Sequence, residues 1–476
     1  MFRSYSIDVC PGNPLYGYLD QCAVAYTNIY NTGLFVCRQV YFGLNKEEDQ
    51  RQENEKLILK QLSDALPLMQ ATRKDSEKQY SMPVKGKTAL SYTFLNSFFY
   101  VTDNPDYFDE VLPRQSTQQA LRQICQDMRA FYAEKRAYKK TPALFSGEPK
   151  APKYKPKGQG STFTMTNQTC HVTTDADGEC VLQLPYFNGQ SQVLRLGKYV
   201  QSDWVLRQVN VVPFHGLFQV RIVFDDRKAV PEVRAEKNGS QRICAIDLGV
   251  ANFAAMSNNI GKPAMLIKGG VVINANKHCT KYIGKLQSLQ TTGTTTKLKP
   301  TKRVKRLLIN RQHCLSDFTH KSARLIINWC TDNDIDTVVA GSNPLWKQNA
   351  NIGKNTQKFE QIPYDQFKRT LKELCIQEGI LYIAQEESYT SRASFLDSDP
   401  IPVYQPELSQ SRTIFSGTRS KRWYRTKSGI TVNADMGGSA NIGRKAFPAL
   451  FNCETCDILS RPTIYRHPDQ GLTVAK

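Results

Sequence analysis

The sequence lacks any long apolar run. Nowhere does it approach the roughly 18 consecutive apolar residues that a membrane-spanning helix requires. Its first ten residues contain no apolar core of signal-peptide length. We therefore expect no membrane partner and no cleaved leader. In the cell interior, the 13 cysteines are expected to stay reduced rather than to form disulfides.

Acidic residues are scarce relative to basic ones. Aspartate and glutamate number 43 against 63 lysines and arginines, which gives a formal net charge of +20. Such an excess attracts polyanions and favours nucleic acid as a partner.

The positive charge is concentrated in two stretches. The first consists of Lys297, Lys299, Lys302, Arg303, Lys305 and Arg306. The second includes Lys153, Lys155 and Lys157, with aromatic residues such as Tyr154 between the charges. Rings can stack on bases and ammonium groups can contact phosphates, so both stretches are predicted to bind nucleic acid. A solvated linker explains the second stretch equally well, and a nuclear import signal would explain the first.

One aspartate stands at the end of a predicted central strand. The run from Arg242 to Phe253 is apolar enough for a buried strand, and Gly249 interrupts it just after Asp247. An RNase H-type nuclease needs this arrangement, because a carboxylate held on a rigid strand can bind a divalent metal. A single Asp before Gly is also common as a plain turn residue, so partners are needed.

Two further acidic positions follow in the chain. An apolar run over residues 379–384 ends in Glu386 and Glu387, and a second short strand leads to Asp435. Small residues after Asp435 would let a helix pack closely behind its carboxylate. Each acid alone would be a surface residue or a helix N-cap. In this order, the three positions predict a Mg²⁺ site.

These segments resemble a known family. AIDLGVANFAAMSN, EESYTSRASFLDSDPIP and NADMGGSANIGRKAFP look like the parts of the split RuvC nuclease in the TnpB family, and residues 338–380 resemble a block of one branch. TnpB proteins are RNA-guided DNA endonucleases of insertion sequences, related to Fanzor proteins and to small type V CRISPR effectors. The resemblance runs from about Arg242 to Pro448.

The resemblance implies that Asp247, Glu387 and Asp435 are catalytic and share two Mg²⁺ ions, which two-metal nucleases hold roughly 3.5 to 4 Å apart. Most family members carry the second acid at the end of the strand that matches 337–340, where this chain has none. Glu387 is therefore expected to replace it, as in a branch with a rearranged glutamate. Glu386 is the alternative, because side chains alternate along a strand and only one of the pair can face the site.

The zinc ribbon of typical family members is expected to be missing. Ser394 stands where they have the first cysteine, and no cysteine occurs between Cys375 and Cys453. Cys453 and Cys456 form one close pair without a matching second pair, whereas structural zinc usually takes four ligands. We expect two ordinary thiols and no structural zinc.

The fold class expected from the pattern and the resemblance is multidomain α+β. Residues 1–10 would be the first strand of a wedge domain, 11–140 a helical recognition lobe, and 141–240 a small antiparallel β-barrel wedge domain. An RNase H-like (RuvC) α/β nuclease domain would span 241–450, with a helical insertion at 277–334, and 451–476 would be a tail. The clearest single helix is predicted near 116–138, after Pro113, with Ala120, Ile124 and Met128 on one face.

The resemblance implies a guide RNA from the transposon and a double-stranded DNA target beside a short flanking motif. The assembly would be a monomeric ribonucleoprotein, in the cytoplasm or nucleoid of a bacterium or in the nucleus of a eukaryote. Two alternatives remain open. One is a nuclease-dead RNA-guided repressor, because relatives often carry Asn where this chain has Gly437. The other is a DDE-type transposase or resolvase, which also uses three acids.

Overall fold

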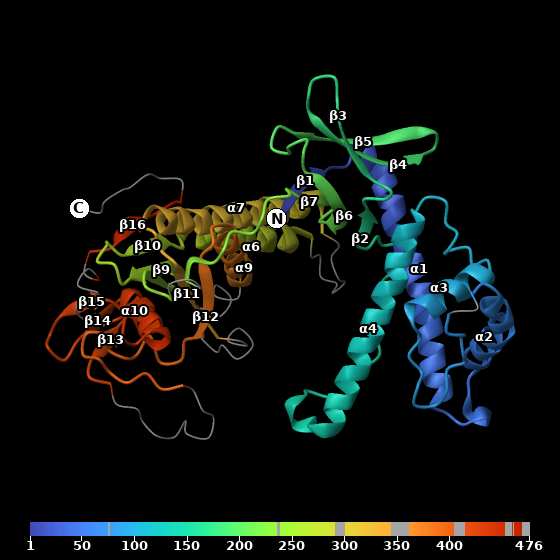
Figure 1. Ribbon diagram of the computed structural model, residues 1–476, viewed down its shortest axis with the longest axis horizontal. Coiled ribbons are helices and arrows are strands. Elements are labelled where there is room, and N and C mark those ends of the chain that lie inside the picture. The colour runs from blue at the N-terminus through green and yellow to red at the C-terminus, as the bar shows by residue number, and fades with distance from the viewer. Residues whose placement is uncertain are drawn as a thin grey trace. The chain divides into compact units, whose positions relative to one another are not determined.

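The computed structural model describes residues 1–74, 77–235, 239–290, 300–343, 361–403, 415–452, 459 and 461–468. The chain divides into two compact units, Met1–Lys228 and Ala229–Lys476, which are coloured blue to green and green to red in Figure 1. None of the helices among the described residues has the length and apolar character needed to cross a membrane.

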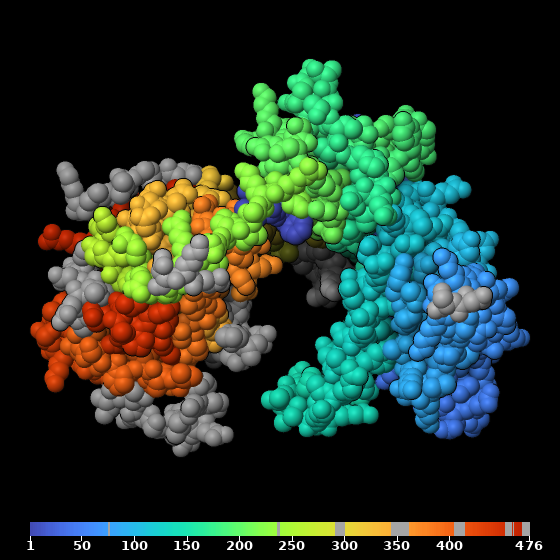
Figure 2. Space-filling model, in the orientation of Figure 1, coloured from blue at the N-terminus to red at the C-terminus, as the bar shows by residue number. Residues whose placement is uncertain are grey.

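The first unit contains the helices α1 (Leu15–Leu44), α2 (Glu53–Ala71), α3 (Tyr92–Val101) and α4 (Arg114–Lys140), with short 3-10 turns at Glu48–Gln50 and Pro142–Leu144. The predicted helix is confirmed as α4, which begins directly after Pro113. Its predicted apolar face is buried in the core of the unit. In the space-filling view, the C-terminal turns of α4 stand away from the other helices of this unit (Figure 2).

Two antiparallel sheets complete the first unit. One has the order β1-β7-β6-β2, with bounds Phe2–Val9, Leu217–Asp225, Val205–Phe214 and Phe163–Thr166. The other has the order β3-β4-β5, with bounds His171–Thr174, Cys180–Phe187 and Gln190–Gly197. The expected antiparallel strands are therefore present, but among the described residues their pairings form two open sheets and do not show a closed barrel.

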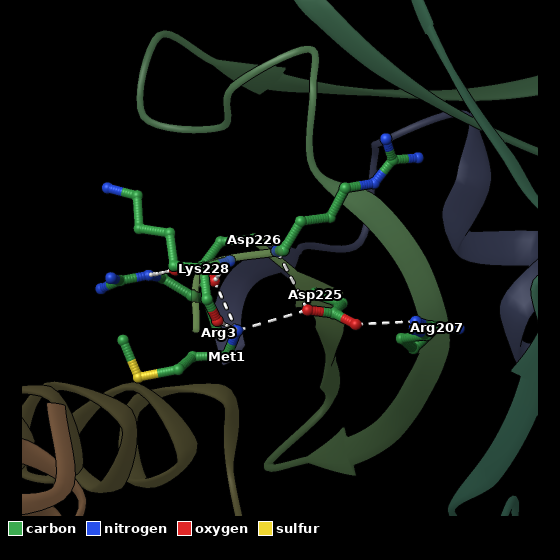
Figure 3. Close-up of polar contacts among 7 residues, drawn as sticks. Met1, Arg3, Arg207, Asp225, Asp226 and Lys228 are labelled. Atoms are coloured by element: carbon green, nitrogen blue, oxygen red, sulfur yellow. Dashed lines mark hydrogen bonds and ion pairs between the residues drawn. The ribbon is translucent and has the colours of Figure 1, made fainter. Parts of the chain in front are cut away.

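Strand β1 is fixed at its outer end by a cluster of charges (Figure 3). The amino group of Met1 lies 2.6 Å from the Asp226 carboxylate and 3.3 Å from that of Asp225. Arg3 donates to Asp226 at 2.7 Å, and Arg207 bonds Asp225 at 2.7 Å. These contacts join the first strand to the end of β7, more than two hundred positions later.

The second unit is built on a mixed sheet of order β12-β11-β8-β9-β10-β16. The bounds are Leu381–Glu386, Thr337–Ser342, Ile243–Leu248, Asn252–Asn258, Met265–Lys268 and Thr463–Tyr465. Strands β8, β11 and β12 run parallel, whereas β9 runs antiparallel to both of its neighbours. A meander of β8, β9 and β10, extended on the β8 side by the parallel strand β11 and then by β12, is the RNase H-like arrangement. The expected fold class is therefore confirmed for this unit.

Helices cover both faces of this sheet, namely α6 (Gly270–Gln290), α7 (Lys302–Asp332), α9 (Tyr364–Gln377) and α10 (Ala434–Ala446) (Figure 1). Side chains of α7 and α9 pack with Cys244 and Ile246 of β8 on one face. Side chains of α10 pack with Ile243 and Ala245 on the other. A separate sheet, β13-β14-β15 (Thr418–Ser420, Trp423–Arg425, Thr431–Asn433), runs directly into α10.

Candidate active site

Asp247 is the next-to-last residue of β8, the strand between β9 and β11. It shares the strand face of Ile243 and Ala245, which is the face that α10 covers. Gly438 of α10 makes this close approach possible, because a β-carbon there would lie 2.6 Å from Oδ2 of Asp247. Burial, followed by the nearby carboxylates of Glu387 and Asp435, raises the pKa of Asp247 well above its usual range.

Glu387 occupies the space that Gly341 leaves empty. Gly341 lies on β11, pairs with Gln385 of β12, and follows the strand residues where the family resemblance expects an acid. A β-carbon on Gly341 would collide with Oε2 of Glu387 and would lie 2.8 Å from Ile442 of α10. The carboxylate of Glu387 thus reaches the end of β11 from the neighbouring strand. Burial is the main cause that raises the pKa of Glu387.

Glu386, the residue before it, has different partners. Its carboxylate pairs with Lys445 of α10 and accepts the backbone N–H of Ser388 at 2.7 Å. Partial burial acts to raise the pKa of Glu386, but the hydrogen bonds from Lys445 and Ser388 lower it overall. Of the two glutamates that the sequence left open, Glu387 is the one whose charge acts on Asp247.

Asp435 stands in the first turn of α10. Asn433 caps this helix, and its side chain accepts the backbone N–H of Asp435 at 3.0 Å. Oδ2 of Asp435 accepts from Nδ2 of Asn252 at 2.7 Å, and Oδ1 accepts from Nη2 of Arg419 at 3.0 Å. Lys268 in turn donates to Oδ1 of Asn252 at 2.7 Å.

The loop after Glu387 is anchored to α10 by a buried asparagine. Nδ2 of Asn441 donates to the carbonyl oxygens of Thr390 and Ala393, both at 2.8 Å. The hydroxyl of Thr390 donates to the carbonyl of Glu387 at 2.8 Å. Helix α10 therefore positions all three acidic residues: Asp435 is part of it, Asp247 packs on it, and the Glu387 loop is bonded to it.

The three acids suit a hard divalent cation in their chemistry. Carboxylate oxygens are the ligands that Mg²⁺ prefers. Burial is the main cause that raises the pKa values of Asp247 and Glu387, and a bound cation would favour the charged form of both carboxyls. The carboxylates do not meet at a single point, since among the described residues no three acidic, histidine or cysteine side chains lie close enough to hold one ion. The separation has a physical reason, because hydrogen bonds from Arg419 and Asn252 hold the Asp435 carboxylate.

Ser394, which stands where typical family members have a zinc-binding cysteine, is part of a hydrogen-bonded turn. Ser394 is buried, its N–H donates to Asp399 at 2.8 Å, and its hydroxyl donates to Asp397 at 2.5 Å. Cys453 and Cys456 lie outside the described residues.

The first stretch of basic residues predicted to bind nucleic acid lies in part at the start of α7. Lys302, Arg303 and Arg306 are exposed in the first turns of α7, with Lys305 half-buried beside them, whereas Lys297 and Lys299 lie outside the described residues. Positive side chains at a helix N-terminus add to the positive end of the helix dipole, so this end of α7 attracts anions.

The segment that follows α4 lies along α1. Lys153 and Lys157 are exposed, but the Lys155 ammonium lies 4.0 Å from the ring centroid of Tyr30. The backbone of Lys155 exchanges two hydrogen bonds with the Asn31 side chain, at 2.8 and 2.9 Å. Desolvation lowers the pKa of Lys155. This lysine is held against α1, and only its neighbours point freely to solvent.

Sequence reasoning missed four residues of the site: Asn252, Lys268, Arg419 and Asn441. Asn252 and Lys268 are polar positions at the ends of apolar strands, and Asn441 is an amide in a helix of small residues, so a weak signal existed for each. Arg419 lies in a polar segment with many arginines, and nothing in its surroundings distinguishes it.

Comparisons with known proteins agree with the resemblance. Residues 227–346 match the family OrfB_IS605, described as "Probable transposase". The match begins shortly before β8 and ends just after β11, so it includes Asp247 but neither Glu387 nor Asp435. Over this segment, the chain is similar to that family. No curated protein matches the chain.

Several solved structures are similar in fold. A Cas12f1-sgRNA-target DNA complex is 12% identical, with 87% of this chain and 82% of that chain covered and a TM-score of 0.45. An AacC2c1-sgRNA binary complex is 8% identical, with 93% and 89% covered and a TM-score of 0.41. C2c1 of Alicyclobacillus acidoterrestris with single-guide RNA is 7% identical, with 89% and 70% covered and a TM-score of 0.36. Likeness at these low TM-scores does not bear on function.

Proposed function

We propose that the chain is an RNA-guided, metal-dependent DNA endonuclease of the transposon-associated TnpB type. The observation that carries this proposal is the placement of Asp247, Glu387 and Asp435 around α10. The family match over residues 227–346 supports it independently of the site geometry.

Asp247, Glu387 and Asp435 would hold the divalent metal. When bound, Mg²⁺ would supply an activated water and stabilise the leaving 3′-oxygen of a phosphodiester. The protein contributes position: β8 fixes Asp247, the Asn441 bonds fix the loop of Glu387, and the Asn433 cap fixes the turn of Asp435.

Nucleic-acid binding is supported by the charge of the chain and its placement. The net charge is +20, and the exposed basic turns at the start of α7 provide a sequence-independent contact for phosphates. In this proposal, base pairing with a guide RNA selects the target, and the protein holds the duplex by its backbone.

The test begins with the RNA that copurifies with the chain. We expect RNA of discrete length, and its sequence would define a matched DNA target for a cleavage assay in Mg²⁺. RNA-guided binding without cleavage would identify the repressor instead. Protein that is free of RNA and shows no guided binding would contradict the proposal and favour a transposase or resolvase.

The matched variants are Glu387→Gln and Glu386→Gln. Glu387→Gln keeps the size of the side chain but removes the charge needed for metal, so cleavage should collapse while target binding persists. Glu386→Gln removes only the ion pair with Lys445, and cleavage should stay close to that of the parent. Full cleavage by Glu387→Gln together with loss in Glu386→Gln would move the ligand by one residue.

A further inference from the structure

Both carboxylate oxygens of Asp435 are occupied by donors in the free protein. Arg419 bonds Oδ1 and Asn252 bonds Oδ2, at 3.0 and 2.7 Å. A carboxylate whose oxygens both accept hydrogen bonds from nitrogen groups is less open to a divalent cation. The third acid of the proposed metal site is therefore present but engaged.

The two donors are held with different strength. Asn252 is buried, and its own carbonyl oxygen is fixed by Lys268 at 2.7 Å. Arg419 reaches in from β13, and its side chain is 37% exposed against 22% for Asp435. A partly exposed ion pair is weak and shifts an equilibrium by about two- to fivefold. Arg419 is thus the donor that can leave.

Further cations lie near the pair of Arg419 and Asp435. Besides Arg419, the Lys268 ammonium lies close to the carboxylate through Asn252, and both Arg422 and Arg466 are near enough to act on Lys268. Such a group of cations is suited to a phosphate backbone. If the guanidinium of Arg419 left Asp435, it could form bidentate hydrogen bonds with a phosphate.

We propose that Arg419 is a displaceable counter-ion: it occupies Asp435 in the free protein and moves to a nucleic-acid phosphate when a divalent cation takes that carboxylate. This inference rests on the proposed function, because it assumes that Asp435 is a metal ligand. Its consequence is that the site binds metal weakly until nucleic acid is present.

The experiment measures Mn²⁺ binding to the nucleic-acid-free protein by calorimetry or paramagnetic resonance. Arg419→Ala should tighten Mn²⁺ binding by about two- to fivefold, the range of a partly exposed ion pair. The control is Arg425→Ala, which removes the same charge from an exposed position of the same small sheet and should leave the affinity unchanged. Arg419→Lys keeps the charge and should lie between Arg419→Ala and the parent.

A second arm adds a DNA oligonucleotide. The difference in Mn²⁺ affinity between the parent and Arg419→Ala should shrink, because the phosphates then hold Arg419 away from Asp435. The variant should also bind the oligonucleotide with a less steep dependence on salt.

The failures can be told apart. Unchanged or weaker Mn²⁺ binding by Arg419→Ala overturns the counter-ion role if Asp247→Ala still loses binding. Unchanged Mn²⁺ binding by Asp247→Ala overturns the metal site and with it the proposed function. Equal tightening by Arg419→Ala and Arg425→Ala would show a general charge effect, and this also overturns the specific role of Arg419.

Discussion

Two adjacent glycines of α10 make a sharp test of the site. A β-carbon on Gly437 would meet nothing within 4 Å, whereas one on Gly438 would lie 2.6 Å from Oδ2 of Asp247. Both stand inside the same helix, where Ala is favoured over Gly by about 1 kcal/mol. Gly437→Ala should therefore stabilise the protein by about 0.5 to 1 kcal/mol and leave cleavage intact.

Gly438→Ala gains the same helix preference but overpacks the site, at a cost of about 1 to 3 kcal/mol. We expect it to be neutral or destabilising by up to about 2 kcal/mol, with cleavage and Mn²⁺ binding strongly reduced because Asp247 is displaced. Thermal unfolding and the cleavage assay measure the two effects separately.

The control removes the atom that would clash. In an Asp247→Ala background, Gly438→Ala should become stabilising, like Gly437→Ala, because the carboxylate is gone. If Gly438→Ala matches Gly437→Ala in both stability and activity with Asp247 present, α10 does not pack on Asp247 as described.

Three more outcomes are expected. Gly341→Glu combined with Glu387→Gly should restore part of the cleavage that Glu387→Gly loses, because the new carboxylate would start in the space that Glu387 fills; no recovery would contradict the shared space. Four basic residues stand at the start of α7, namely Lys302, Arg303, Lys305 and Arg306. Neutralising them together should weaken DNA binding and flatten its dependence on salt, and an unchanged salt titration would refute this. In EDTA, the stability of the protein should fall as pH rises above about 4, because the fold favours the protonated form of Asp247. Thermal unfolding should show a weaker fall for Asp247→Asn, and an equal fall would rule out Asp247 as the cause.

Local patterns predicted local structure well. Helix α4 and strand β8 follow from the spacing of apolar side chains and from Pro113 and Gly249, all of which act within a few residues. The pairing of β1 with β7 could not be found in this way, because residues such as Ile7 and Val220 are far apart in the chain and an edge strand carries no mark of its partner. Only the resemblance suggested that the opening strand joins the later ones.

The sequence singled out the acids of the candidate site but not its cations. Carboxylates at strand ends are conspicuous because they interrupt apolar runs, so Asp247 and the two glutamates stand out in the sequence. Arg419 lies among other basic residues, and its role depends on a three-stranded sheet that brings it back to the start of α10. Charge alone did not separate it from Arg422 or Arg425.

The empty acid position on β11 and the choice between the two glutamates have one physical explanation. Strands β11 and β12 are parallel neighbours in register, so a carboxylate just past the end of either can reach the same space. Gly341 keeps that space free, and any side chain there would collide with Glu387. Glu386 is drawn away by Lys445. If Glu387 binds metal as proposed, a ligand can move between adjacent parallel strands with the metal site left in place, provided that a glycine remains where the first ligand stood.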